Sequence, residues 1–474
     1  MFGFLKKTAA KSALPPLQFH NTLSGQKEEF VPINGTVKMY NCGPTPYDEQ
    51  HIGNMVPAIL GNLIRQSLET WGYKVLQVMN ITDFGHLVSD ADDGEDKMSK
   101  GLKREGMAFT MAGMRKLAEK YTKLFLRDIK SLGAPVDKIK FPRASEYIQE
   151  EIACVDALFQ KGYAYQTSDG IYYDTSKFPG YGKLGGLTDG PAEARIVAHS
   201  EKKNARDFAL WKFAEGEKKL GWKSPWGKGF PGWHIECTAM IFALLGRQID
   251  IHTGGIEHIP VHHNNEIAQA EAITGKQYVR YWLHNNHITI EGKKISKSLG
   301  NTIYLHNIVD KGLNPLAFRY WFLTGHYRTP MNFTWEAIEG AATALTRLTR
   351  AYLEMEEGER NEEFLNQFYT AIGNDLSTAH ALALVWENIG SLNKATLSEV
   401  DKILGLGLAT ARPIQKLAVV PESDLPEDIQ KLVREREEAR TARDFAAADE
   451  LRGQLEAAGY SVTDTAEGQK IAKK

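Results

Sequence analysis

The chain has few cysteines, no long apolar run and almost no net charge. Its three cysteines, Cys42, Cys154 and Cys237, are too few for a disulfide framework, and free thiols fit a reducing cytoplasm. The longest apolar run, Ala239–Leu245, is far shorter than the ~20 residues that cross a bilayer, so we expect no membrane span. Lys and Arg number 57 against 59 Asp and Glu, a net charge of −2, which excludes a broadly basic nucleic-acid coat protein. The sequence therefore predicts a cytoplasmic, globular protein.

The first part of the chain has the pattern of an open parallel sheet. A strand is expected over 36–41, an amphipathic helix over 55–71 and a second strand over 73–82. Such a β-α-β unit predicts an α/β fold with a Rossmann-like, doubly wound parallel sheet, which we assign to residues 21–335. Ligands of these sheets bind at the carboxyl ends of the strands, here near residues 41–54 and 80–84.

The rest of the chain divides by its change of pattern. Residues 1–20 form an N-terminal extension, and charged helices followed by glycine-rich turns indicate an insertion over about 90–208. Helical periodicity beyond Trp335 predicts an all-α helical bundle over 336–420. Residues 421–474 are expected to form a helix pair and a tail, with Asp444 as the N-cap of the second helix.

The first motif with chemical meaning is His51-Ile52-Gly53-Asn54, between the loop after the first strand and the following helix. Free backbone N–H groups at a helix N-terminus favour anions, and Gly53 lets a ligand approach closely. His51 and Asn54 can reach phosphate oxygens, so the motif fits a nucleotide phosphate. Taken alone, four residues fit a capped helix with a surface histidine at least as well.

The second motif is Lys294-Ile295-Ser296-Lys297-Ser298, bounded by Gly292 and Gly300. Two lysines and two hydroxyls on a glycine-bounded loop suit a mobile clamp on a transferring phosphoryl group, although a basic turn is usually only solvated. Together, the two motifs resemble the paired HIGH and KMSKS motifs of class I aminoacyl-tRNA synthetases.

A third group of residues, Cys42, Cys237, His262 and Glu266, has the chemistry of a zinc site. His262 and Glu266 are four residues apart at the start of a helix expected over 264–274, so both side chains can face one side. Two thiolates, one imidazole and one carboxylate suit Zn²⁺. Taken singly, each residue has a structural explanation, since a lone cysteine is usually a small buried hydrophobe. His263 is an alternative to His262, but its spacing from Glu266 gives poorer convergence.

From about Asn21 onward, the whole chain resembles the cysteinyl-tRNA synthetase family. The landmarks recur in order: FHNTLSGQKEEF, MYNCGPTPYDEQHIGN, NITD, PGWHIECTAM, DIHTGG, HHNNEIAQAEA, KKISKSLGN and RDFAAADELR. The resemblance implies one Zn²⁺ per chain, held by Cys42, Cys237, His262 and Glu266. It also implies that Gly53, Lys297 and Ser298 bind ATP. Three further residues, Thr82, Trp233 and His252, lie where the family shapes its amino-acid pocket.

The activity implied by the resemblance is the ATP-dependent ligation of L-cysteine to cysteine tRNA through a cysteinyl-adenylate. The α-phosphorus of Mg-ATP would be attacked first, with the catalytic residues His51, Asn54, Lys294 and Lys297 stabilising the phosphate charge. The helical bundle would lie on the anticodon side of the tRNA, and the chain is expected to act as a monomer. A zinc–thiolate bond rejects serine and alanine by roughly 10⁴–10⁵, so the insertion should have no editing role.

The chain departs from the family pattern at a few positions. Asn54 stands where the family usually has a second histidine, and its amide can donate a hydrogen bond but cannot become cationic. Asn264 replaces an acidic residue. Two other functions remain open: a ligase that joins cysteine to an amino sugar, and a catalytically silent relative that binds RNA. The helical region after Trp335 argues against the first, and Lys297 with the zinc residues argues against the second.

Overall fold

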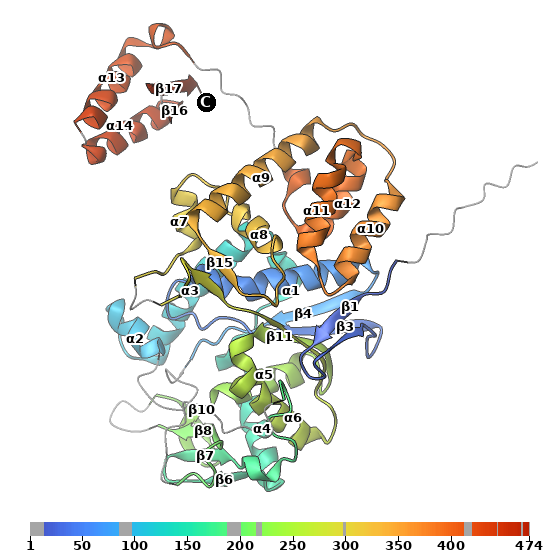
Figure 1. Ribbon diagram of the computed structural model, residues 1–474. Helices are drawn as coiled ribbons and strands as arrows, with labels where there is room; N and C mark the ends of the chain where they lie inside the picture. Colours follow the sequence, from blue (N-terminus) through green and yellow to red (C-terminus); the bar gives the residue numbers. More distant parts are fainter. Residues whose placement is uncertain are drawn as a thin grey trace, which may run out of the picture. The chain divides into compact units, whose positions relative to one another are not determined.

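The computed structural model describes residues 14–84, 97–186, 201–214, 220–296, 300–411, 420–442, 444–465 and 468–473 (Figure 1). The chain divides into two compact units, Met1–Ala411 and Arg412–Lys474. In the described residues, no helix combines the length and the apolarity needed to cross a membrane.

A five-stranded parallel sheet organises the first unit. Its order is β12 (Val279–Asn285), β11 (Ile249–Gly255), β3 (Thr36–Asn41), β4 (Lys74–Met79) and β5 (Ile139–Lys140). All four neighbouring pairs are parallel. Because the chain starts at the central strand, adds strands on one side and then returns to the other, the sheet is doubly wound. The predicted fold class is confirmed.

Helices cover both faces of this sheet (Figure 1). One face carries α1 (Ile52–Thr70) with α3 (Met111–Ser131), and the other carries α5 (Trp233–Leu244) with α6 (Asn264–Thr274). Alternation along β3 explains this arrangement, because Met39 joins the core around α1 whereas Tyr40 packs with residues of α5 and α6. The helix expected over 264–274 is observed with those bounds and ends at Gly275, whose φ is 67°.

Part of the region predicted as an insertion belongs to the parallel sheet. Within it lie α2 (Lys97–Arg104), α3, β5 and α4 (Ile148–Gln160), and β5 pairs with β4. An antiparallel sheet follows, with strands β6 (Ala164–Gln166), β7 (Gly170–Tyr173), β8 (Phe208–Phe213), β9 (Trp222–Ser224) and β10 (Gly227–Pro231). This sheet continues past residue 208 because β10 pairs with both β8 and β9.

The end of the predicted N-terminal extension is also structured. A hairpin of β1 (Gln18–Asn21) and β2 (Gln26–Glu29) opens the described chain, and Phe19 is fully buried. A second small sheet contains β13 (Ile288–Ile290), β14 (Lys293–Lys294) and β15 (Met331–Phe333), with α7 (Leu305–Asp310) between β14 and β15 in the sequence.

The helical region shares one hydrophobic core with the parallel sheet. It comprises α8 (Leu316–Leu323), α9 (Trp335–Glu354), α10 (Glu362–Gly373), α11 (Thr378–Asn388) and α12 (Lys394–Leu404). Its buried side chains form a single cluster with those of α1. Arg319 of α8 is fully buried there, and Nη1 donates to Asn62 of α1 (2.7 Å) while Nε donates to the carbonyl of Leu404 (2.6 Å). This region is therefore fastened to the Rossmann-like core.

The second unit has a small core of its own. It consists of α13 (Glu427–Thr441), α14 (Phe445–Ala457) and a hairpin of β16 (Tyr460–Thr465) and β17 (Gly468–Lys473). The helix pair and the Asp444 cap are as predicted, and Asp444 accepts a hydrogen bond from the backbone of Ala447 (3.1 Å). The expected tail is instead the hairpin, whose short, polar strands give a weak sequence signal but bury Tyr460 and Ile471.

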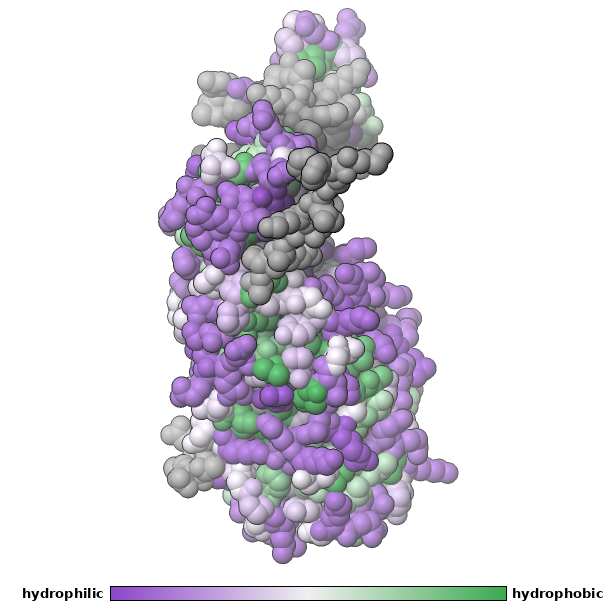
Figure 2. Space-filling model, turned by 90° about the vertical axis from the view of Figure 1, so that its right-hand side faces the viewer, coloured by the Kyte–Doolittle hydropathy of each residue, from purple (hydrophilic) through white to green (hydrophobic). Residues whose placement is uncertain are grey.

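The exposed surface is mainly hydrophilic. On the face shown in Figure 2, hydrophobic residues appear as separate groups among polar ones. The large hydrophobic side chains described as exposed are Leu14, Val31, Phe109 and Val309. These positions are far apart in the sequence, and singly exposed apolar residues need no functional explanation.

Candidate active site

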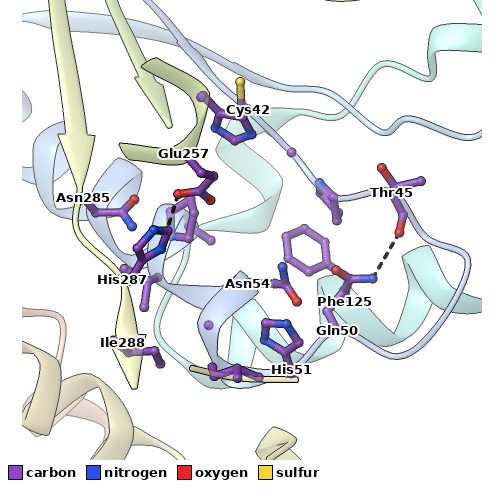
Figure 3. A pocket seen from close by; sticks show the side chains of 18 of the residues that line it. Cys42, Thr45, Gln50, His51, Asn54, Phe125, Glu257, Asn285, His287 and Ile288 are labelled. Atoms are coloured by element: carbon purple, nitrogen blue, oxygen red, sulfur yellow. Dashed lines mark hydrogen bonds and ion pairs between the residues drawn. The ribbon is translucent and has the colours of Figure 1, made fainter. Parts of the chain in front are cut away.

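A pocket of about 540 Å³ lies at the carboxyl ends of the parallel strands (Figure 3). Its walls come from the loop after β3, the first turn of α1, the start of α5, and the segments after β11 and β12. Its lining includes Cys42, His51, Gly53, Asn54, Lys97, Trp233, Glu257, His258, His287 and Lys294. The pocket therefore lies where the strand-end rule placed it.

One end of the pocket brings the two phosphate motifs together. The backbone N–H of Ile52 donates to the carbonyl of Ile303 (2.9 Å), and His51 forms an isolated bridge with Tyr304. A Cβ on Gly53 would lie 3.0 Å from Cδ1 of Ile295, so the start of α1 and the loop that carries Lys294 are in close contact.

Two lysines were assigned to this end of the pocket. Lys294 lines it, and Asn301 fixes the loop by donating to the Lys294 carbonyl (3.0 Å). Lys297 and Ser298 lie outside the described residues. The start of α1 and the loop around Lys294 therefore meet at this end of the pocket.

The other end of the pocket leads to a buried cluster of metal-ligating side chains. One ligand atom from each of Cys42, His262, His263 and Glu266 lies within 4.8 Å of all the others. Nε2 of His262 is 3.0 Å from Oε1 of Glu266, and Sγ of Cys42 is 3.2 Å from Nε2 of His263. Cys237 of α5 is buried and hydrogen-bonded to Cys42. The cluster thus contains three of the four predicted ligands together with His263, and Cys237 adjoins it through Cys42.

A local irregularity of the helix explains why both histidines face Cys42. Residues Ile259–His263 form a π-helical turn directly before α6. A π turn holds more residues than an α turn, so neighbouring positions rotate less relative to one another. In a regular α-helix His263 would face away from Cys42, which is why His262 alone is expected as a ligand from the spacing.

Hydrogen bonds from the surrounding shell orient both histidines. Nδ1 of His262 is 2.9 Å from Nδ1 of His234, and Nδ1 of His263 is 2.7 Å from Nε2 of His284. Nδ1 of His284 is in turn 2.8 Å from the hydroxyl of Thr22. Partners of this kind fix ring orientation at metal sites.

The cluster contains strongly shifted titratable groups of both signs. The hydrogen bond with Cys237 is the main reason that the pKa of the Cys42 thiol lies well below its ordinary value. Burial raises the pKa of Glu266, but His252 and His262 outweigh it and lower the pKa to about 2. Burial lowers the pKa of His262, yet hydrogen bonds with Cys42 and Glu266 raise it to about 10. Without a metal, Cys42 and Glu266 are thus anionic beside a protonated His262, and the pKa of Cys237 lies well above its ordinary value, mainly because of its hydrogen bond with Cys42.

The three residues assigned to the amino-acid pocket have different positions. Trp233 lines the pocket, and its ring centroid is 4.4 Å from that of His262. Thr82 and His252 are buried and are not among the lining residues. Thr82 donates to Oε2 of Glu236 (3.3 Å), and Nε2 of His252 lies 3.1 Å from Oε2 of Glu266. Both are therefore placed to act through a neighbour.

Sequence reasoning missed several lining residues. Glu257 and His258 follow the glycines at the end of β11, a position that the strand-end rule could have singled out. In Figure 3, Glu257 and His287 point toward one another, and Nδ1 of His287 lies 3.5 Å from Oε2 of Glu257. Lys97 had no such signal, because it begins a helix and does not follow a strand end marked by glycine.

Asn264, one of the departures from the family pattern, has a structural role. Its Nδ2 donates to the carbonyls of Leu184 (3.2 Å) and Ile259 (2.7 Å), and its Oδ1 accepts from the backbone of Leu184 (3.1 Å). A carboxylate could not donate the first two bonds, so the amide fits this position.

Two family models match most of the chain. The tRNA synthetases class I (C) catalytic domain matches residues 29–343, and the cysteinyl-tRNA ligase anticodon binding domain matches residues 422–471. Cysteine–tRNA ligase 1 of Burkholderia lata is 44% identical over 467 residues, which cover 96% of this chain and 97% of that protein. Cysteine–tRNA ligase of Thermus thermophilus is 40% identical, with coverage of 95% and 98%.

Solved structures agree on the fold. Mycobacterium tuberculosis methionyl-tRNA synthetase in complex with methionyl-adenylate superposes with a TM-score of 0.56 at 14% identity, covering 79% of this chain and 89% of that one. This likeness concerns the fold alone. With the domain match and the near full-length relatives, the chain belongs to the cysteine–tRNA ligase family of class I aminoacyl-tRNA synthetases.

Proposed function

We propose that this chain joins L-cysteine to cysteine tRNA in two steps, through a cysteinyl-adenylate. The observation that carries the proposal is a single pocket with two chemically different ends. The end formed by Gly53 and Ile295 suits ATP phosphates, and the end formed by Cys42 and Trp233 suits a thiol-bearing amino acid. An enzyme that activates cysteine with ATP needs both ends in one cavity.

In the first step, a carboxylate oxygen of cysteine attacks the α-phosphorus of Mg-ATP. The new P–O bond forms as the bond to the bridging oxygen breaks, and pyrophosphate leaves with the electron pair. His51 and Asn54 at the start of α1, with Lys294 and Lys297, stabilise the phosphate charge, while Gly53 and Ser298 help to hold ATP. Their contribution is positioning and electrostatic, as in other phosphoryl-transfer sites.

We assign Cys42, Cys237, His262 and Glu266 as ligands of one Zn²⁺ per chain. Cys42, His262 and Glu266 lie in one cluster and Cys237 is hydrogen-bonded to Cys42, and thiolate, imidazole and carboxylate donors are ligands that this ion prefers. When bound, zinc supplies a coordination bond that the substrate thiolate can form and a serine hydroxyl cannot match. Trp233 shapes the pocket wall, and Thr82 and His252 position Glu236 and Glu266.

In the second step, a terminal ribose hydroxyl of the tRNA takes the cysteinyl group, and AMP leaves. We propose that the helical region of α9 to α12 and the second unit bind the tRNA. We also propose that the protein acts as a monomer. Local basic faces are sufficient for such binding even when the net charge is near zero. The free thiols support a cytoplasmic location.

Cysteine-dependent exchange of pyrophosphate into ATP tests the first step. Zinc-loaded protein should catalyse exchange with cysteine and not with serine, and no exchange with cysteine would overturn the proposal. Transfer of labelled cysteine to a cysteine tRNA transcript tests the second step. Exchange without charging of the tRNA, combined with transfer to an amino sugar, would favour the alternative ligase.

A further inference from the structure

A histidine and a carboxylate face each other in the pocket. Nδ1 of His287 lies 3.5 Å from Oε2 of Glu257, and Figure 3 shows the two side chains directed toward one another. Both residues line the pocket, and about half of each side chain is exposed, 51% for His287 and 53% for Glu257. In the described part of the chain, Nε2 of His287 makes no hydrogen bond. This second ring nitrogen is therefore available to a substrate.

The pair stands between the two ends of the pocket. Glu257 is followed by His258, whose ring centroid is 5.3 Å from that of His262 in the metal-ligating cluster. His287 directly precedes β13, and β13 pairs with β14, whose Lys294 lines the phosphate end. In a cysteinyl-adenylate, the carbonyl carbon joins the cysteine part to the phosphate, so it too belongs between the two ends. The pair therefore lies along the stretch of wall where that carbonyl is expected.

Anchored segments present both side chains. The backbone N–H of Asn286 donates to the carbonyl of Tyr327 (2.8 Å), and Oδ1 of Asn286 accepts from the backbone of His287 (2.8 Å). The carboxylate of Glu257 packs over Gly255, where a Cβ would collide with both of its oxygens. Since a half-exposed ion pair adds little to stability, substitution of either member should leave the fold intact.

We propose that His287 is the general base of the second step, an inference that rests on the proposed function. A terminal ribose hydroxyl of the tRNA attacks the carbonyl carbon of the cysteinyl-adenylate. The ester C–O bond forms as the bond between the carbonyl carbon and the phosphate oxygen breaks, and AMP leaves with that electron pair. Nε2 of His287 takes the hydroxyl proton and later releases it to solvent. Glu257, at Nδ1, orients the ring and stabilises the imidazolium.

The chemistry of the two steps explains why such a base serves only the second. In the first step, the carboxylate of cysteine attacks in its ionised form, so no proton has to be removed from it. The ribose hydroxyl, in contrast, must lose a proton as it attacks. The half-exposed ring of His287 can be reached from outside the pocket by the end of a large substrate, whereas the fully buried His252 cannot.

The test measures the two steps separately on full-length, zinc-loaded protein. Cysteine-dependent exchange of pyrophosphate into ATP reports the first step. Single-turnover transfer from preformed cysteinyl-adenylate to a saturating cysteine tRNA transcript reports the second. The variants are His287→Gln, His287→Ala and Glu257→Gln. The matched control is His20→Gln, which changes a histidine of β1 outside the pocket lining.

In His287→Gln, transfer should fall ~10²-fold or more while exchange stays within about twofold, because only the second step loses its base. Glu257→Gln should slow transfer to a smaller extent, and His20→Gln should change neither step. Added imidazole should raise the transfer rate of His287→Ala, since it can occupy the space of the missing ring and take the proton. A purely structural role of His287 predicts no such rescue.

Several results would overturn the inference. Equal loss of both steps would assign His287 to the first step or to structure, as would a His287→Ala variant that imidazole does not rescue. Transfer that recovers at higher tRNA concentration would assign the residue to tRNA binding instead of proton transfer. Absence of exchange in the wild-type protein would overturn the proposed function itself. Exchange and transfer by wild type, with unchanged transfer in His287→Gln, would overturn only the role of His287.

Discussion

Sγ of Cys42 lies 3.2 Å from Nε2 of His263, although the two residues are 221 positions apart in the sequence. A hydrogen bond between Nδ1 of His263 and Nε2 of His284 holds the His263 ring in this orientation. His262 reaches the same cluster through Glu266. Either His262 or His263 could therefore serve as the histidine ligand of a four-ligand site. The predicted ligand is His262.

Substitution of the two histidines separates their roles. His262→Asn should reduce bound zinc from about one per chain to well below half, as should Cys237→Ser, because each removes a proposed ligand. His263→Asn should keep the metal with affinity lowered ~10–100-fold, the usual cost of losing an orienting partner. Atomic absorption after dialysis against a graded series of chelator concentrations measures this. If His263→Asn loses the metal and His262→Asn keeps it, the assignment must be exchanged.

Replacement of Asn54 tests how the chain works without the usual second histidine. Asn54→Ala should lower the kcat of pyrophosphate exchange by ~10²–10³ with little change in the KM for cysteine, because a donor to the transition state is lost. Asn54→His should reach at least the wild-type rate, since imidazole also donates. An alanine variant within about twofold of wild type would show that Asn54 makes no contact that catalysis uses. Equal melting temperatures of the three proteins serve as the control.

Arg319 is expected to be a main support of the junction between α1 and the helical region. Arg319→Met leaves the carbonyls of Leu404 and Leu132 and the side chain of Asn62 without their buried donor, which should cost about 3 kcal/mol. Thermal unfolding should show a Tm lower by about 3–4 °C, because the unfolding entropy of a unit of this length makes each kcal/mol worth about 1 °C. Arg350→Met, on the exposed side of α9, is the matched control and should change stability by less than about 0.5 kcal/mol. Similar effects of the two substitutions would contradict this role.

Glu151 should make the stability of the protein depend on pH. The residue is wholly buried on α4, and neither carboxylate oxygen has a hydrogen-bond partner among the described residues. Burial, with the nearby charges of Glu236 and Asp83, raises its pKa well above the ordinary value. A raised carboxyl pKa contributes stability below the unfolded-state pKa, and this contribution is lost as pH rises toward the folded-state pKa.

The stability gained by Glu151→Gln over wild type should therefore grow with pH from about 5 to 8, by up to about 1.4 kcal/mol per unit. Differential scanning fluorimetry at several pH values measures it as a widening gap between the two Tm values. The matched control is Gln149→Ala, which changes an exposed, uncharged neighbour on the same helix and should give a gap that does not vary with pH. A constant gap for Glu151→Gln as well would refute the buried-charge argument.

Regular periodicity explains which elements were predictable. The strand over 36–41 and the helix over 264–274 appear with the expected bounds, because alternating or helical spacing of apolar residues reflects the face that each element buries. Cys154 is buried on α4, as its apolar surroundings indicate. The hairpin of β16 and β17 was missed because its polar strands depend on pairing with each other and on packing against α13 and α14.

The residues of the candidate site that belong to short sequence motifs could be predicted. Cys42, His262 and Glu266 were assigned from residue type, spacing and resemblance, and they lie together in the structure. Lys97 and His258 could not be found this way, since they reach the pocket through the packing of α2 and of the segment after β11.

The sequence by itself determined the parallel α/β fold, the place of the pocket at the strand ends and the chemical types of its ligands, because these follow from local periodicity and side-chain chemistry. Only the tertiary structure decided that His263 joins His262 beside Cys42 and that a lysine stands against Trp233. The first depends on a π-helical turn and the second on the contact between α2 and the loop after β3. Both are properties of how distant segments pack, which no local pattern encodes.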